Sequence, residues 1–213
     1  MATHERGERP SLEGWMTTVR AVSILACTFV ETAALVVWLA VVQTAALSSA
    51  TALVGWGILA VGLLVERILK DLTANGVDLA VSTGSLVGLT LAETTVWNLW
   101  LAVAEASIAI EGFVLAATVL AVSLAVVYTI EDNALRGVVP HSSLLDSGTA
   151  SVGVVTAVGA TAWLLCELRP ATAAQWLGTV GIESADPALA GLGVLALALF
   201  VTHNVGVAYA RSS

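Results

Sequence analysis

Apolar residues dominate six long runs of the chain, and short polar breaks separate them. The runs cover roughly 17–45, 50–72, 79–104, 108–135, 146–168 and 187–210. Each reaches the length of about 20 residues that a helix needs to cross a bilayer. The breaks carry turn residues such as Asn75-Gly76 and Arg169-Pro170, and short breaks favour antiparallel helical hairpins. The pattern predicts an all-α integral membrane protein of about six transmembrane helices, with 169–186 as a longer loop that places Trp176 at the membrane interface.

The composition agrees with this class. Hydrophobic residues make up 58% of the 213 residues and charged residues only 11%, whereas soluble domains carry roughly 25% charged residues. The net charge is −8, and Lys70 is the single lysine, a balance that excludes nucleic acid as a partner and is typical of halophiles. The partner that the composition indicates is the lipid bilayer.

The basic residues indicate the orientation of the chain. Only Arg169 is expected on the side opposite to the N-terminus. The other seven are expected on the side of the N-terminus, namely Arg6, Arg9, Arg20, Arg67, Lys70, Arg136 and Arg211. The positive-inside rule then predicts a multi-pass protein of the cell membrane with both termini cytoplasmic. Residues 1–14 are polar and lack the features of a signal peptide, so we expect a cytoplasmic tail there and a single six-helix transmembrane domain over 15–213.

Similar stretches recur along the chain. The sequence ETAALVVWLAV at 31–41 resembles ETTVWNLWLAV at 93–103, and the stretch around Glu66 resembles the stretch around Glu131. A weaker third copy carries Trp163 and, in the sixth run, His203. We therefore predict three two-helix hairpin repeats over about 17–75, 79–137 and 146–211. The hairpins could form a pseudo-threefold bundle or a side-by-side array. For the recurring tryptophans Trp38, Trp100 and Trp163 we expect an interfacial belt or packing contacts, and the alternative is a gate or a stacking platform.

Five ionisable residues within the runs are the candidate site. Glu31 and Glu93 lie near the middle of their runs, where a carboxylate normally faces a protein interior or a water-filled cavity. Because successive helices alternate in direction, three further residues are expected at a similar depth. Carboxylates and imidazole bind divalent cations, and close carboxylates can hold and pass protons. The predicted cation or proton site comprises Glu31, Glu66, Glu93, Glu131 and His203.

Other polar residues have simpler interpretations. Arg67 with Asp71, and Asp132 with Arg136, are i,i+4 pairs that we expect to serve only as helix-end electrostatics, and Lys70 is spaced to pair with Glu66. Glycines such as Gly84 and Gly88 permit close helix packing, inside the bundle or in a homo-oligomer.

The function that this pattern favours is cation handling, of a proton or a divalent metal, by a transporter or channel. Two alternatives remain: a membrane enzyme or redox subunit with a metal, haem or lipid-soluble substrate at the same cluster, and a structural or accessory subunit. The sequence carries no CxxC, no HExxH and no Gly-rich phosphate loop, so enzyme activity is left open, with the weight against it. A divalent metal ion is the cofactor that the five residues would suit.

Overall fold

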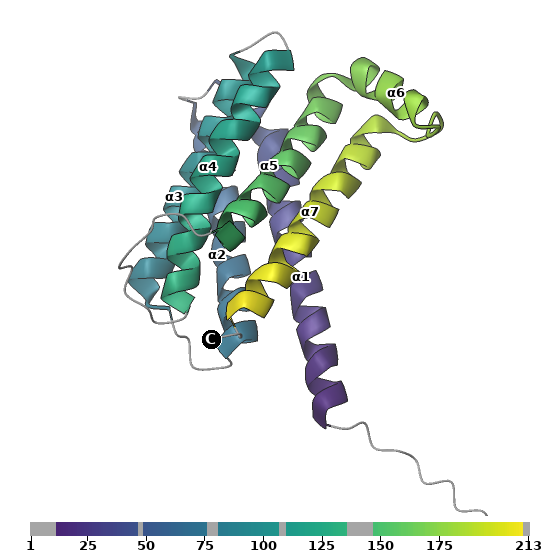
Figure 1. Ribbon diagram of the computed structural model, residues 1–213. Coiled ribbons are helices and arrows are strands. Elements are labelled where there is room, and N and C mark those ends of the chain that lie inside the picture. The colour runs from purple at the N-terminus through teal and green to yellow at the C-terminus, as the bar shows by residue number, and fades with distance from the viewer. Residues whose placement is uncertain (1–11, 47–48, 76–80, 107–109, 136–146, 211–213) are drawn as a thin grey trace, which may run out of the picture.

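The computed structural model describes residues 12–46, 49–75, 81–106, 110–135 and 147–210 (Figure 1). These residues form seven helices and no strand. The helices are α1 (Leu12–Val42), α2 (Ala50–Asn75), α3 (Thr83–Glu105), α4 (Ile110–Leu135), α5 (Ser147–Leu168), α6 (Pro170–Thr179) and α7 (Pro187–Ala210). Six of them, all except α6, contain a segment long and apolar enough to cross a membrane. The prediction of an all-helical protein with six spans is confirmed.

Residues 169–186 were expected to form a loop, and that expectation is wrong for its first half. Helix α6 begins at Pro170, directly after Arg169, where proline is favoured because its missing N–H would have no partner inside the helix. The helix ends before Gly181, which has a positive φ of 78°. Trp176 on α6 is 48% exposed, as a residue at a membrane interface would be.

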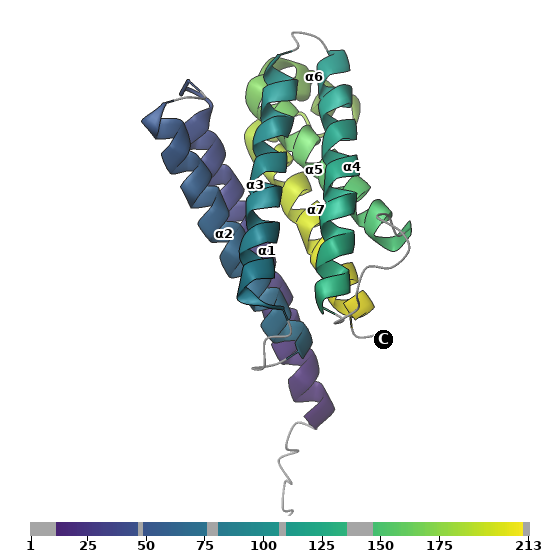
Figure 2. The ribbon, with the colours of Figure 1, turned by 90° about the vertical axis from the view of Figure 1, so that its left-hand side faces the viewer.

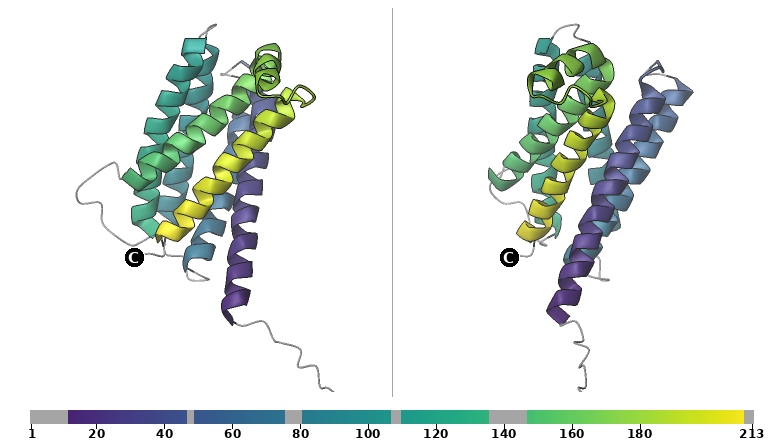
Figure 3. Two further views of the ribbon diagram at one scale, coloured as in Figure 1. Left: turned by 45° about the vertical axis from the view of Figure 1, so that its right-hand side comes forward. Right: turned by 90° about the vertical axis from the view of Figure 1, so that its right-hand side faces the viewer.

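The six long helices form a closed ring. Each packs against the next in chain order, and α7 returns to α1, while α2, α4 and α7 also contact one another across the ring. The pair of α1 and α2 is seen side by side in Figure 2, and α7 beside α5 in Figure 3. Closed packing of six helices does not require related sequences, so the three-hairpin repeat stays a prediction.

The outer surface of the ring is apolar. Side chains more than half exposed include Phe29 (73%), Leu53, Val61, Val114 and Leu197. A soluble protein rarely exposes apolar surface on this scale, whereas lipid is the solvent that such a surface suits. The six apolar helices and this surface indicate a polytopic membrane protein in contact with the bilayer.

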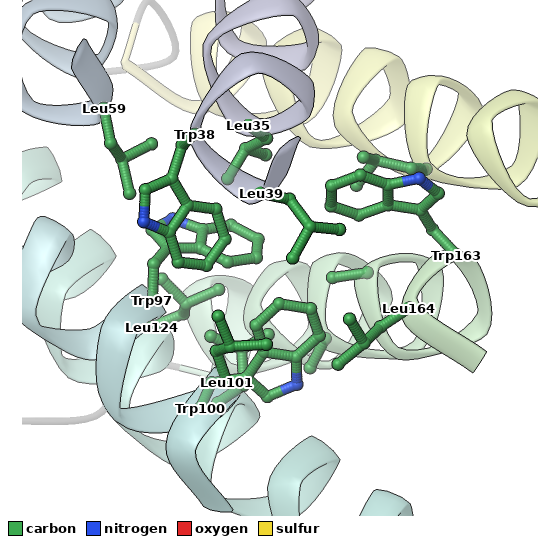
Figure 4. Packing of buried hydrophobic residues seen from close by; sticks show 14 of the residues in the cluster. Leu35, Trp38, Leu39, Leu59, Trp97, Trp100, Leu101, Leu124, Trp163 and Leu164 are labelled. Atoms are coloured by element: carbon green, nitrogen blue, oxygen red, sulfur yellow. The ribbon is translucent and has the colours of Figure 1, made fainter. Parts of the chain in front are cut away.

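Tryptophans form the centre of the apolar core (Figure 4). Trp38, Trp97, Trp100 and Trp163 are each at most 1% exposed, and the rings of Trp97 and Trp100 meet edge to face at 5.4 Å. The expected interfacial belt is therefore wrong, and the alternative of packing contacts is right. Aromatic pairs of this kind add about 0.5–1.5 kcal/mol beyond the burial of their area.

Several glycines let helix backbones approach closely. A Cβ built at Gly153 of α5 would lie 2.9 Å from the Ala121 carbonyl oxygen and 2.9 Å from the Ala125 amide nitrogen of α4. In contrast, a Cβ at Gly88 of α3 would meet nothing within 4 Å in the described structure. Small residues thus serve packing within the bundle, and a role of Gly88 in an oligomer stays a prediction.

We predict that Gly153→Ala lowers the free energy of unfolding in detergent by about 1–3 kcal/mol, because backbone atoms of α4 must move to admit the methyl group. Gly88→Ala is the matched control, and we expect it to be neutral or stabilising by up to about 1 kcal/mol, since alanine favours the helix. Thermal or denaturant unfolding measures both. Equal effects of the two substitutions would contradict the close contact between α4 and α5.

Candidate functional site

The five predicted residues converge in one buried network. They come from five helices, namely Glu31 (α1), Glu66 (α2), Glu93 (α3), Glu131 (α4) and His203 (α7), and none is more than 6% exposed. Two basic residues of α2, Arg67 and Lys70, link the three carboxylates of α2, α3 and α4. His203 then joins Glu31 to Glu66. The alternating helix directions bring these side chains to one depth, on the side of the tryptophan core away from α6.

One half of the network pairs two bases with two carboxylates. The Arg67 guanidinium donates to Glu93, and its Nη1 lies 3.0 Å from Glu131 Oε2. The Lys70 ammonium donates to Glu131 Oε1 at 3.0 Å. Trp97 completes the surroundings, because its Nε1 donates to Glu93 Oε1 at 3.3 Å. This half ties α2 to α3 and α4 with charges that balance.

The role expected for Arg67 was wrong. It is 2% exposed and binds carboxylates of two other helices, so it is no helix-end residue. Asp71 is fully buried as well, and it accepts hydrogen bonds from Asn75 Nδ2 and the Val81 N–H. Arg136 lies outside the described residues, so its expected pair with Asp132 is untested. The buried role of Arg67 could have been predicted from its depth. It lies two turns before the end of an apolar helix, where a charge needs a buried partner.

The other half of the network joins one imidazole to two carboxylates. His203 Nε2 lies 3.1 Å from Glu31 Oε2 and 3.0 Å from Glu66 Oε1. Lys70 Nζ approaches Glu66 Oε1 to 3.1 Å, as its spacing predicted. Yet no contact of Glu66 Oε1 within the described structure has hydrogen-bond geometry, so these approaches are electrostatic contacts. The Glu66 oxygen therefore lies among charges without an aligned donor.

The Thr28 hydroxyl contacts Nδ1 of His203, whereas the other ring nitrogen, Nε2, faces the carboxylates. Its hydroxyl donates to the Ile24 carbonyl oxygen at 3.0 Å, since a carbonyl can only accept. When that proton points at Ile24, the Thr28 oxygen accepts from His203 Nδ1, 3.1 Å away. Nδ1 then carries a hydrogen, and in the neutral ring Nε2 presents a lone pair to two carboxylate oxygens. That arrangement is repulsive unless a positive species lies between them.

A pocket adjoins the balanced half of the network. It opens between α4, α5 and α7, has an empty volume of about 500 Å³ that includes its open side, and is lined in part by Lys70, Tyr128, Glu131, Thr149 and Thr202. Lys70 and Glu131 therefore belong both to the pocket wall and to the buried network. Two side chains connect the pocket to His203, because Lys70 contacts Glu66 and Glu66 contacts His203.

The charges of the network do not cancel. Four carboxylates face two permanent cations, Arg67 and Lys70, which leaves a formal charge of −2, or −1 when His203 is protonated. A net charge buried among apolar helices is costly. The arrangement can therefore take up a cation, either a proton or a metal ion, and Glu31, Glu66 and His203 are close enough together to hold a metal ion.

Comparison of the chain with protein-family models, with curated proteins and with solved structures finds no match. The helices and the network they enclose indicate a polytopic helical membrane protein with a buried carboxylate–histidine cluster.

We predict that Arg67→Met destabilises the protein by about 3–5 kcal/mol, because it leaves Glu93 and Glu131 buried with too little positive charge. Arg67→Lys keeps the charge but loses the two-pronged guanidinium, so we expect it to recover part of that loss. Unfolding in detergent at neutral pH measures both variants. If Arg67→Met were as stable as the wild type, Arg67 would not be the buried link between α2, α3 and α4.

Proposed function

We propose that the protein handles a cation, a proton or a divalent metal, as a transporter or channel, at the cluster of Glu31, Glu66, Glu93, Glu131 and His203. The observation that carries this proposal is the uncompensated negative charge of a network buried between apolar helices. A purely structural network would gain stability from balanced charges, whereas a cation site needs an excess of carboxylate.

The position of the cluster supports the proposal. On one side it reaches the pocket through Lys70 and Glu131. On the other side lies the tryptophan core, in which Trp38, Trp97 and Trp100 leave no exposed surface. Trp38 follows Glu31 by two helical turns, about 10 Å along α1. Alternating access requires a site that is open to one side and closed to the other. In this proposal the tryptophan layer is the barrier that has to open.

A structural role is the second candidate, and the balanced half of the network favours it. Arg67 and Lys70 tie Glu93 and Glu131 to α2, as expected of a subunit whose polar residues only join helices. The half with Glu31 and Glu66 does not fit this role, because the two carboxylates share one imidazole. The Lys70 ammonium contacts Glu66 but is also paired with Glu131. The two candidates therefore differ in what they predict for Glu31.

The orientation is also part of the proposal. Helix α1 begins and α7 ends at the same end of the bundle (Figure 1). Arg67 and Lys70 lie in the buried network, so they no longer count as loop charges. The bias falls from seven against one to five against one, and Arg169 remains at the opposite end. We propose a single six-helix domain of the cell membrane over 15–213, a tail over 1–14 and cytoplasmic termini.

For the function, we predict that purified protein in liposomes carries a cation current, measured with a pH-sensitive dye for protons and with metal-sensitive dyes for Mn²⁺ and Zn²⁺. Glu31→Gln should lower the rate by at least about tenfold, equivalent to about 1.4 kcal/mol in barrier height, because it removes one of the excess charges. Glu105→Gln, at the exposed end of α3, is the matched control and should keep the wild-type rate. Folded protein that carries none of these cations would favour the structural role.

For the orientation, we predict that a C-terminal fusion to green fluorescent protein is fluorescent and that a C-terminal fusion to alkaline phosphatase is inactive, because only the first matures in the cytoplasm. The same reporters fused after Gly178, which follows five spans, should give the opposite pattern. An active C-terminal phosphatase would reverse the proposed topology.

A further inference from the structure

We infer that Glu31, Glu66 and His203 form a three-ligand site for a divalent first-row transition metal of the Zn²⁺ type. The inference rests on the proposed cation site and names the ion that occupies it. The three ligands come from α1, α2 and α7, so the metal would join the first hairpin to the last helix.

The spacing of the ligand atoms fits a metal of this size. His203 Nε2 lies 3.1 Å from Glu31 Oε2 and 3.0 Å from Glu66 Oε1, and all three ligand atoms lie within 4.8 Å of one another. Ligands about 2.0–2.2 Å from Zn²⁺ in a tetrahedron are separated by roughly 3.4 Å. The two oxygens need to move outward from the imidazole nitrogen by only a few tenths of an ångström to admit the ion.

The orientation of the ligands points to the same conclusion. A metal-bound histidine normally donates its other N–H to a neighbouring acceptor, which fixes the ring. Thr28 lies 3.1 Å from Nδ1, where it can accept that hydrogen, and Nε2 faces the two carboxylates. Glu66 Oε1 supplies an independent observation, because Glu66 is 3% exposed and this oxygen has no hydrogen bond within the described structure. A metal ion would give the unaligned oxygen a partner.

The set of ligands selects the class of ion. Ca²⁺ takes six to eight oxygen ligands, and Mg²⁺ demands an octahedron of oxygens and retains its water. Two carboxylates and one imidazole are too few for Ca²⁺, and the nitrogen favours a transition metal. Three protein ligands also leave a fourth position open, as in sites that exchange a ligand, whereas purely structural zinc sites are closed by four protein ligands. The open position suits an ion that must enter and leave.

Lys70 supplies a route by which the site could adapt to the ion. Its ammonium lies 3.1 Å from Glu66 Oε1 and 3.0 Å from Glu131 Oε1, so it can withdraw from Glu66 towards Glu131 when a metal takes the Glu66 oxygen. Because Lys70 also lines the pocket, the same movement would accompany entry of the ion from that side.

The test is metal binding by the full-length protein, purified in detergent and stripped with a chelator. Zn²⁺ is titrated against a chromophoric competitor, and Co²⁺ serves as an absorbing substitute. We expect one Zn²⁺ per chain and, for Glu31→Gln, Glu66→Gln and His203→Gln, binding weaker by more than about 100-fold. Thr28→Val should weaken binding by about 10–100-fold, since it acts only through His203. Glu105→Gln is the control and should bind as the wild type does.

The outcomes separate this inference from the proposed function. Thermal unfolding of each variant shows whether it is folded, and the conservative Thr28→Val variant keeps the test decisive if a ligand variant fails to fold. Stoichiometric Zn²⁺ binding that survives all of the ligand substitutions would place the metal elsewhere and overturn the inference. Absence of Zn²⁺ and Co²⁺ binding would also overturn it, and if a proton current that depends on Glu31 remained, the proposed function would stand. Absence of both binding and current would overturn both.

Discussion

The need to pair charges inside an apolar bundle governs the arrangement of the helices at the level of the site. Arg67 lies within the second span and is 2% exposed, so it requires counter-charges at its own depth. Glu93 and Glu131 supply them from α3 and α4. Rotating or sliding any of the three helices would leave a charge in the interior without its partner. The contacts of Arg67 therefore constrain the register of α2, α3 and α4.

The bundle divides along its axis into a layer of apolar packing and a layer of charge. Trp38 and Trp100 lie two helical turns beyond Glu31 and Glu93 on the same helices, so each of these helices contributes to both layers. Two of the buried tryptophan N–H groups also have partners, since Trp38 donates to Asn98 and Trp100 to Thr161. A rigid apolar layer beside the cluster excludes water from one side, which strengthens every charge interaction within it.

Within the charged layer, the half with balanced charges holds helices together, whereas the half with excess carboxylate can accept a cation. Arg67 and Lys70 neutralise Glu93 and Glu131 and thereby hold three helices together. Glu31 and Glu66 face one imidazole whose second nitrogen is committed to Thr28. Lys70 contacts both Glu66 and Glu131, so a change of charge at the imidazole would be felt at the pocket. A stable scaffold and a cation-accepting site can thus share one network.

The class of the protein, its six spans and the common depth of the five ionisable residues were all predictable from the amino-acid sequence. These features depend on local properties, namely runs of apolar residues and the alternating direction of successive helices, which the order of residues states directly.

The sequence did not reveal α6, where a proline at the first helical position outweighed the appearance of a loop. The sequence also left the place of Trp38, Trp100 and Trp163 open between belt and core, because a tryptophan near a helix end suits both. The folded bundle was needed to show that Arg67 lies at the centre of the cluster, that Thr28 contacts His203 and that Glu31 and Glu66 converge on one nitrogen. Those contacts join residues up to 175 positions apart, and they depend on how each helix is rotated in the ring, which no local pattern specifies.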